Sequence, residues 1–436
     1  MKVFLDSVGC RLNQSELESY ARQLRAAGHD LVPGPEQADV TVVNTCTVTV
    51  AAAADSRKKI RRAARAGCGD VVVTGCWSTL LPQRAASLPG VGRVIPNAEK
   101  DTLVAEMLGL PPEEIAGDSG PRLPIPGPRM RTRAFIKAQD GCDNHCSFCI
   151  TKLARGPARS RPVEAVLADV NAALAGGSRE VILTGVNLGA WGRDLPSRPG
   201  LAALITAVLE QTDVPRLRVS SLEPWDLDAE FFDLWQDERL GRHLHLPLQS
   251  GSAATLRRMV RATTPDDYAA LVETARRAIP DVAITTDIIV GFPGESEADF
   301  EESLAFVRRM EFAGGHVFTY SKRPGTAAAR LPDPVPHPVR KERNAAMRAV
   351  LQASEKAYAE RFVGRRVNVL WERADQCEDG WRMEGLSGNY LRVRAHAASC
   401  LHNQISTVEL TGLNGRGLVG TIEPGNEKGI PSTEPG

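Results

Sequence analysis

Three cysteines in one short loop carry the clearest chemical signal in this sequence. Cys142, Cys146 and Cys149 have the spacing C-x3-C-x2-C. This spacing gathers three thiolates round one centre, with no fourth thiolate nearby. A structural zinc site normally closes with four ligands, whereas an iron-sulfur cluster held by three cysteines leaves one iron free for a substrate. His145 could close a zinc site instead, but it lies inside the loop between two of the ligands. The pattern favours an iron-sulfur cluster.

A second group of cysteines follows the strands of a predicted β-α-β-α-β unit. The strands are short valine-rich runs at residues 3–6, 39–45 and 70–75, and the helices are expected at residues 14–27 and 55–66. Cys10, Cys46 and Cys76 follow the three strands in turn. Because the carboxyl ends of parallel strands meet at one edge of a sheet, we expect these cysteines to converge on one site.

The remaining cysteines have no such placement. The nine cysteines of the chain are an odd number, which argues against a disulfide framework and for metal or redox chemistry. Cys68, Cys377 and Cys400 are each expected to be a small buried hydrophobic residue. The amino end lacks the layout of a signal peptide, and no apolar run reaches the ~18 residues that span a bilayer. We therefore expect a cytoplasmic protein with no membrane partner.

The elements that position these cysteines fall into several domains. A chain of 436 residues has room for roughly two to four domains. The sequence predicts an α/β protein with a doubly wound parallel-sheet domain at residues 1–110, a proline-rich linker at 111–132, an incomplete (β/α)6 barrel at 133–338, a connecting helix at 339–363, a small antiparallel β-barrel at 364–424 and a disordered tail at 425–436.

The central barrel is predicted from an alternation of strands and helices. Strands are expected at residues 134–138, 180–184, 217–221, 244–248, 282–290 and 315–320, and helices at 162–175, 200–212, 265–278 and 296–310. A barrel of this kind carries its chemistry at the carboxyl ends of its strands. The C-x3-C-x2-C loop follows the first strand, which places it at that end.

At this point the sequence resembles the radical S-adenosylmethionine (SAM) methylthiotransferases over nearly its whole length. The shared motifs are GCRLN at residues 9–13 with Glu16, NTCTVT at 44–49, GC at 75–76, the loop at 142–149, HLHLPLQSGS at 243–252 and DIIVGFPGE at 287–295. The resemblance implies two 4Fe-4S clusters. Cys142, Cys146 and Cys149 would hold the cluster that binds SAM, and Cys10, Cys46 and Cys76 would hold an auxiliary cluster. It also implies that the terminal barrel is an RNA-binding TRAM domain.

The implied reaction needs SAM at the mouth of the barrel. There an electron from the reduced cluster frees a 5′-deoxyadenosyl radical, and the auxiliary cluster offers a sulfur that is methylated and transferred. No catalytic residue is expected beyond the cluster ligands. The candidate SAM contacts lie at strand ends and are Gly185, Asn187, Ser220, Ser221, Gln249, Ser250 and Asp287.

The substrate is predicted separately, because the family acts on tRNA and, in one branch, on a ribosomal protein aspartate. Lys plus Arg and Asp plus Glu both count 53, so net charge does not identify a partner. Two local basic stretches favour RNA: Arg57, Lys58, Arg61, Arg62 and Arg65 on one helix face, and residues 122–161 with nine basic residues against two acids. A solvated helix face explains the first equally well.

The motif SKRPGT at residues 321–326, together with the first two motifs, most resembles the branch that acts on threonylcarbamoyladenosine beside the tRNA anticodon. The implied partners are a tRNA anticodon stem-loop and an electron donor such as flavodoxin or ferredoxin. The alternatives are isopentenyladenosine in tRNA, a ribosomal protein aspartate, and, from another class, a non-catalytic iron-sulfur protein that binds RNA.

Overall fold

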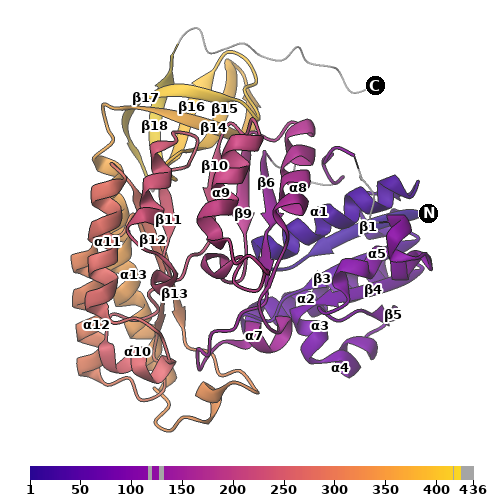
Figure 1. Ribbon diagram of the computed structural model, residues 1–436, viewed down its shortest axis with the longest axis horizontal. Helices are drawn as coiled ribbons and strands as arrows, with labels where there is room; N and C mark the ends of the chain where they lie inside the picture. Colours follow the sequence, from indigo (N-terminus) through magenta and orange to yellow (C-terminus); the bar gives the residue numbers. More distant parts are fainter. Residues whose placement is uncertain (116–119, 127–131, 416, 424–436) are drawn as a thin grey trace. The chain divides into compact units, whose positions relative to one another are not determined.

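The computed structural model describes residues 1–115, 120–126, 132–415 and 417–423 (Figure 1). The chain forms two compact units. Unit 1 consists of Met1–Gly177, Val181–Asp213 and Ser321–Leu331, and unit 2 consists of Ser178–Glu180, Val214–Tyr320 and Pro332–Gly436. The predicted tail at 425–436 and part of the predicted linker lie outside the described residues.

Unit 1 begins with a five-stranded parallel sheet of order β2-β1-β3-β4-β5. The strands are β1 (Lys2–Ser7), β2 (Asp30–Leu31), β3 (Val40–Thr45), β4 (Asp70–Gly75) and β5 (Val91–Val94). The three central strands were predicted. The two edge strands are too short and too polar to form an apolar run, so the sequence pattern did not indicate them.

Six helices accompany this sheet: α1 (Arg11–Ala26), α2 (Val50–Arg65), α3 (Cys76–Leu80), α4 (Pro82–Ala86), α5 (Leu103–Leu108) and α6 (Pro112–Ile115). Helix α2 begins five residues earlier than expected. Its alanine-rich start favours helix, and the Thr49 side chain caps it by accepting a hydrogen bond from the backbone N–H of Ala52 at 3.0 Å. Helix α6 lies within the segment predicted to be a linker.

The remainder of unit 1 carries the first part of the predicted barrel. Its elements are β6 (Arg133–Lys137), β7 (Gln139–Asp140), α7 (Ile150–Arg155), β8 (Arg159–Ser160), α8 (Val163–Ala175), β9 (Glu180–Thr184) and α9 (Gly200–Gln211). Strand β6 is the neighbour of β9 in its sheet, and the short strands β7 and β8 pair with each other beside the cysteine loop. The barrel strands in this unit lie where the sequence predicted them.

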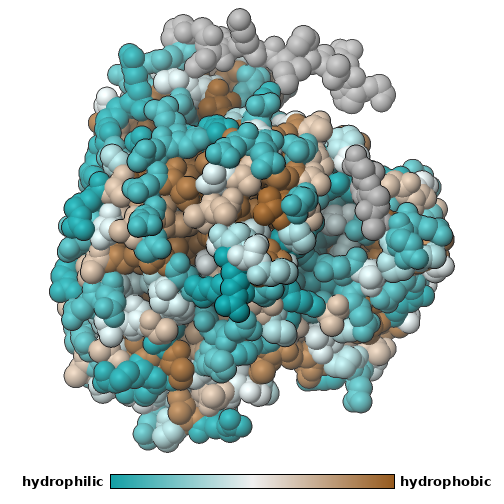
Figure 2. Space-filling model, viewed as in Figure 1, coloured by the Kyte–Doolittle hydropathy of each residue, from teal (hydrophilic) through white to brown (hydrophobic). Residues whose placement is uncertain are grey.

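Unit 2 carries the later barrel strands: β10 (Leu217–Val219), β11 (His243–His245), β12 (Ala283–Val290) and β13 (Gly314–Thr319). The last three form a parallel sheet of order β11-β12-β13. The helices are α10 (Ala253–Met259), α11 (Pro265–Ala278) and α12 (Glu297–Met310). Both longer helices begin with capping boxes, at Thr264 and Ser296. Their outer surface is mostly hydrophilic (Figure 2), as expected of helices that bury only one face.

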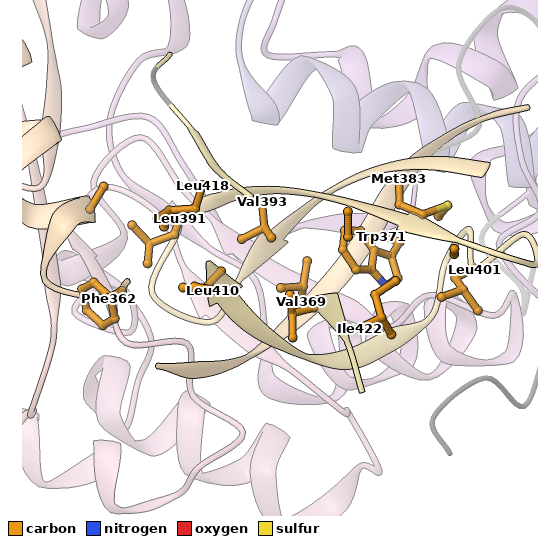
Figure 3. Packing of buried hydrophobic residues seen from close by; sticks show 14 of the residues in the cluster. Phe362, Val369, Trp371, Met383, Leu391, Val393, Leu401, Leu410, Leu418 and Ile422 are labelled. Atoms are coloured by element: carbon orange, nitrogen blue, oxygen red, sulfur yellow. The ribbon is translucent and has the colours of Figure 1, made fainter. Parts of the chain in front are cut away.

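Helix α13 (His337–Glu360) leads to a closed barrel of order β14-β15-β16-β18-β17. Its strands are β14 (Arg366–Cys377), β15 (Gly380–Ser387), β16 (Arg392–Ala397), β17 (Ile405–Asn414) and β18 (Gly417–Ile422). Val369, Trp371 and Met383 belong to its apolar core (Figure 3). Trp371 is fully buried and donates through Nε1 to Ser406 at 3.2 Å, which confirms a core role for this side chain.

A buried cluster of charged side chains links this small barrel to the rest of unit 2. Glu180 pairs with both Arg216 and Arg218. Arg218 donates to the carbonyl oxygens of Ser387 and Gly388 at 3.3 and 3.2 Å. Burying two guanidinium groups costs free energy unless their N–H groups find acceptors. The packing of the small barrel against this cluster therefore depends on the carbonyl groups at the end of β15.

These elements confirm the predicted fold class: an α/β protein with an N-terminal parallel sheet, a central region of alternating strands and helices, and a closed C-terminal β-barrel. Within the described part of the chain, no helix has the length and apolar character needed to cross a membrane.

Candidate active site

The parallel sheet of unit 1 brings Cys10, Cys46 and Cys76 together. Cys46 follows β3, and Cys76 follows β4 as the first residue of α3. Residues 45 and 75, which immediately precede these two cysteines, are paired in the register of the two strands. Cys10 is the N-cap of α1. Burial, and to a lesser degree repulsion from the Cys10 and Cys76 thiolates, raises the pKa of the Cys46 thiol, so the three side chains lie near one another.

Gly9 shows how closely this set is packed. Its φ is +105°, a conformation that glycine adopts far more readily than other residues. A Cβ atom at this position would lie 2.7 Å from both Cβ and Sγ of Cys46. Cys46 and Cys76 are buried, and Cys10 is exposed. The backbone before Cys10 therefore lies directly against the Cys46 side chain.

Cys142, Cys146 and Cys149 lie in the loop between β7 and α7. The backbone N–H of Cys142 donates to the carbonyl oxygen of Gly156 at 3.1 Å, and that of Cys149 donates to the carbonyl oxygen of Cys146 at 3.1 Å. Cys149 is also the N-cap of α7. Local backbone hydrogen bonds thus fold this loop, whereas the first set is held by strands.

In the described part of the chain, neither cysteine set has the close spacing of ligand atoms that a single metal ion requires. Among the described residues, neither set has all three Sγ atoms within 4.8 Å of one another, as ligands of one zinc ion would be. A four-iron cluster holds its thiolates on different irons and therefore farther apart. His145 is exposed and belongs to no described group of close ligands.

A buried ionic network joins the two cysteine sets within unit 1. Arg155, in the last turn of α7, donates to Asn13 Oδ1 at 2.7 Å, to Glu16 Oε1 at 3.1 Å and to Asp140 Oδ1 at 2.8 Å. Lys100 Nζ lies 2.6 Å from Glu16 Oε1 and also contacts Asp140. Asn13 in turn accepts from Cys10 Sγ at 3.6 Å. Helix α7, which begins after Cys149, is therefore linked through Arg155 to Asn13 and Glu16, which follow Cys10 in α1.

This network determines the charge of its members. Burial raises the pKa of Glu16, but attraction to Arg155 and Lys100 outweighs it and lowers the pKa to about 2. The pKa of Asp140 is lowered for the same reasons. Burial raises the pKa of the Cys46 thiol to about 11. Because metal binds the thiolate, iron binding must release this proton.

Asn97 makes a second link between the two sets. Its Nδ2 donates to the carbonyl oxygen of Ala154 at 2.7 Å and lies 3.7 Å from Cys76 Sγ. Sequence reasoning missed Asn97, Arg155 and Lys100. Asn13 and Glu16 gave a signal as parts of the first motif, whereas no motif connects the other three residues to the auxiliary cysteines.

The segment Ser321–Leu331 adds a cation beside the auxiliary set. The backbone N–H of Ala328 donates to the carbonyl oxygen of Ser147 at 2.8 Å, which attaches the segment to the cysteine loop. Burial lowers the pKa of Arg323, and the Cys46 thiolate opposes that shift. Nε and one terminal nitrogen of Arg323 are buried without a hydrogen-bond partner among the described residues. This guanidinium is available for an anionic ligand.

The candidate SAM contacts in unit 1 follow β9. Gln139 Oε1 accepts from the backbone N–H groups of Val186 and Asn187 at 2.9 and 3.1 Å. A Cβ at Gly185 would lie 3.0 Å from the same oxygen. Asn187 Oδ1 is buried and has no hydrogen-bond partner in the described part of the chain. Gln139 thus holds the turn that follows β9, and within this turn Asn187 Oδ1 is a buried acceptor without a described donor.

The remaining candidates lie in unit 2. Ser220 Oγ and Asp287 Oδ1 are buried without a hydrogen-bond partner among the described residues. Ser250 Oγ already accepts from the backbone N–H of Ser252 at 3.2 Å. Gln249 has φ +71° and donates through its backbone to the carbonyl oxygen of Asp287 at 2.8 Å. The oxygens of Ser220 and Asp287 that lack a described partner could each bind a polar ligand. Ser221 is partly exposed, and its contact with SAM stays a prediction.

His243 and His245 have structural partners in unit 2. Both rings lie within hydrogen-bond distance of Thr285 Oγ1, at 2.9 and 3.0 Å. The His243 ring also stacks on Tyr390, with 4.2 Å between the centroids. These contacts support packing roles for the two histidines.

Comparison with known proteins agrees with this fold, which is that of a radical SAM enzyme. The model of the radical SAM superfamily matches residues 136–307, and that of the uncharacterized protein family UPF0004 matches residues 2–95. Among solved structures, the radical SAM methyltransferase TsrM of Kitasatospora setae has a TM-score of 0.58 at 15% identity over 75% of each chain, a likeness of fold.

Curated relatives define the family. The chain is 34% identical to the threonylcarbamoyladenosine tRNA methylthiotransferase MtaB of Bacillus subtilis over 90% of this chain and 89% of that protein. It is 36% identical to MtaB of Thermotoga maritima over 85% and 86%. It is 31% identical to the tRNA-2-methylthio-N(6)-dimethylallyladenosine synthase of Maricaulis maris over 97% of each. The chain belongs to the radical SAM tRNA methylthiotransferases.

Membership confirms the predicted enzyme class and cofactors. Enzymes of this family use SAM and two 4Fe-4S clusters. The alternative of a non-catalytic RNA-binding protein loses its support.

Proposed function

We propose that this enzyme methylthiolates threonylcarbamoyladenosine beside the anticodon of tRNA, giving the 2-methylthio derivative. The observation that carries this substrate is the similarity to the two MtaB proteins, at 34% and 36% identity over most of each chain. The SKRPGT motif, which includes the available Arg323, supports the same branch.

The proposal assigns the two cysteine sets different tasks. Cys142, Cys146 and Cys149 would hold the cluster that binds SAM, and Cys10, Cys46 and Cys76 the auxiliary one. When bound, the first cluster supplies the electron that cleaves SAM and the second supplies the sulfur. The chain's own part is to fix the distance between the sets through Arg155 and Asn97, and to balance the negative charge of the thiolates.

The candidate SAM contacts are part of this proposal. The unused oxygens of Asn187, Ser220 and Asp287 would accept hydrogen bonds from SAM, with Gly185, Ser221, Gln249 and Ser250 shaping the surrounding backbone. A buried acceptor without a donor costs free energy, so a ligand that supplies donors would stabilise each unit at these positions.

The tRNA would meet a basic surface. Lys58, Arg61, Arg62 and Arg65 are exposed on α2, the helix that follows Cys46 in the chain. Such a face can neutralise phosphates and orient a stem-loop. Arg323 would take a phosphate or the carboxylate of the modified base. A reduced flavodoxin or ferredoxin in the cytoplasm would supply the electron.

The alternative tRNA substrate is isopentenyladenosine, which the name of the Maricaulis maris relative describes for that protein. Nucleoside mass spectrometry of tRNA from cells with and without the gene separates the two. We expect deletion to remove 2-methylthio-threonylcarbamoyladenosine and to leave isopentenyladenosine derivatives unchanged. The deletion strain that expresses Cys46→Ala serves as the catalytically inactive control.

An unchanged threonylcarbamoyladenosine pool would reject this substrate. A change confined to isopentenyladenosine would assign the enzyme to the other tRNA branch. A mass change in a ribosomal protein, with unchanged tRNA nucleosides, would favour the aspartate branch.

A further inference from the structure

Three metal-ligating side chains meet on the C-terminal barrel, in the unit that does not contain the six cysteines of the two sets. Cys377 is the last residue of β14, Asp379 lies in the turn that follows, and His396 belongs to β16. His396 Nε2 lies 3.7 Å from Cys377 Sγ and 3.2 Å from Asp379 Oδ1. The three ligand atoms all lie within 4.8 Å of one another. Cys377 and the exposed Cys400 are therefore not the buried hydrophobic residues that the sequence predicted.

The backbone of the barrel holds these groups in place. Cys377 pairs with Gly380 across the turn between β14 and β15, and Arg382 of β15 pairs with His396 of β16. Gly380 has φ +137°, and a Cβ there would lie 2.9 Å from Cε1 and 3.3 Å from Nε2 of the His396 ring. The ring thus lies against the glycine, and a side chain at position 380 would displace it.

The separations match those of a tetrahedral zinc site. With Zn–S near 2.3 Å and Zn–N and Zn–O near 2.0 Å, tetrahedral geometry places sulfur and nitrogen ~3.5 Å apart and nitrogen and oxygen ~3.3 Å apart. The observed values are 3.7 and 3.2 Å.

We propose that Cys377, Asp379 and His396 bind one zinc ion. The thiolate, the carboxylate and a neutral imidazole supply three ligands, and water completes the tetrahedron. The Asp379 side chain is 82% exposed and that of His396 is 49% exposed, so solvent reaches the site. Binding releases the Cys377 proton and cross-links the β14–β15 turn to β16. The six cluster cysteines lie in the other unit of the chain.

Zinc content of the anaerobically reconstituted holoenzyme tests this site, because the cluster cysteines are then occupied by iron. After incubation with Zn²⁺ and desalting, we expect about one zinc per chain in the wild type and in Cys400→Ser, the matched control. Cys377→Ser and His396→Gln should each weaken zinc binding by more than the ~10–100-fold that loss of an outer partner costs.

Cobalt gives a second readout. Co²⁺ added to the holoenzyme should produce a thiolate-to-cobalt charge-transfer band in the near ultraviolet, present in Cys400→Ser and absent in Cys377→Ser. Equal melting temperatures of the wild-type and variant holoenzymes before zinc or cobalt is added would show that the variants fold. Equal zinc content in wild type and Cys377→Ser, or a cobalt spectrum without a thiolate band, would overturn the proposal.

Discussion

The two cysteine sets of unit 1 are positioned by different kinds of backbone structure. Cys142, Cys146 and Cys149 come from one loop that local backbone hydrogen bonds fold. Cys10, Cys46 and Cys76 come from three separate points of a sheet and meet because the strands are parallel and in register. The first set depends on a few residues of loop, and the second on the fold of a whole domain. Substitutions should therefore affect the two sets independently, except where a residue touches both.

The largest effect is expected from Cys146→Ala. Loss of one of three ligands should remove the SAM-binding cluster, so that both 5′-deoxyadenosine formation and tRNA methylthiolation fall to background. Chromatographic assay of both products checks this. Cys68→Ala is the matched control, because the Cys68 thiol contacts Thr41 and the backbone of Asp70, away from both cysteine sets. Residual methylthiolation in Cys146→Ala would contradict the assignment.

Gly9→Ala should disrupt the auxiliary set without removing a ligand. The new Cβ would overlap Cys46, so we expect iron to fall from about eight to about four atoms per chain, with SAM cleavage retained. Gly28→Ala controls for backbone strain, since Gly28 has φ +76° but no atom lies within 4 Å of the place that its Cβ would take. Equal iron loss in both variants would point to general destabilisation.

Arg155→Met should destabilise both sets together. The substitution leaves the carboxylates of Glu16 and Asp140 buried with less positive charge beside them. Breaking a buried ion pair in this way lowers the free energy of unfolding by about 3–5 kcal/mol. Urea unfolding measures this loss. Lys356→Ala removes an exposed pair with Glu360, where the side chains are 66% and 50% exposed, and should cost at most about 0.5 kcal/mol. Similar losses in the two variants would refute the role of the network.

Arg323→Gln should have the smallest effect, confined to the substrate. Loss of a charge-assisted hydrogen bond, worth about 1.5–3 kcal/mol, should reduce kcat/KM for tRNA by roughly 10–100-fold. SAM cleavage without tRNA should not change. Lys322→Gln, at the exposed neighbouring position, is the control. A matching loss of SAM cleavage in Arg323→Gln would place this residue in cofactor binding instead.

The sequence indicates the cysteines of both sets, but it does not indicate every element and side chain that positions them. Local spacing indicates the loop set, and valine-rich runs followed by cysteine indicate the sheet set. The start of α2 and the edge strand β2 were missed, because capping at Thr49 and a two-residue strand leave little periodicity. Arg155 and Asn97 could not be found from the sequence, since their partners lie far away in the chain and only the tertiary fold brings them together.

The division of labour between the two sets is tested most directly by Cys46→Ala in reconstituted, reduced enzyme supplied with SAM and tRNA. We expect 5′-deoxyadenosine formation at a rate close to that of the wild type, with no 2-methylthio nucleoside. Loss of SAM cleavage to the background level of Cys146→Ala would contradict it.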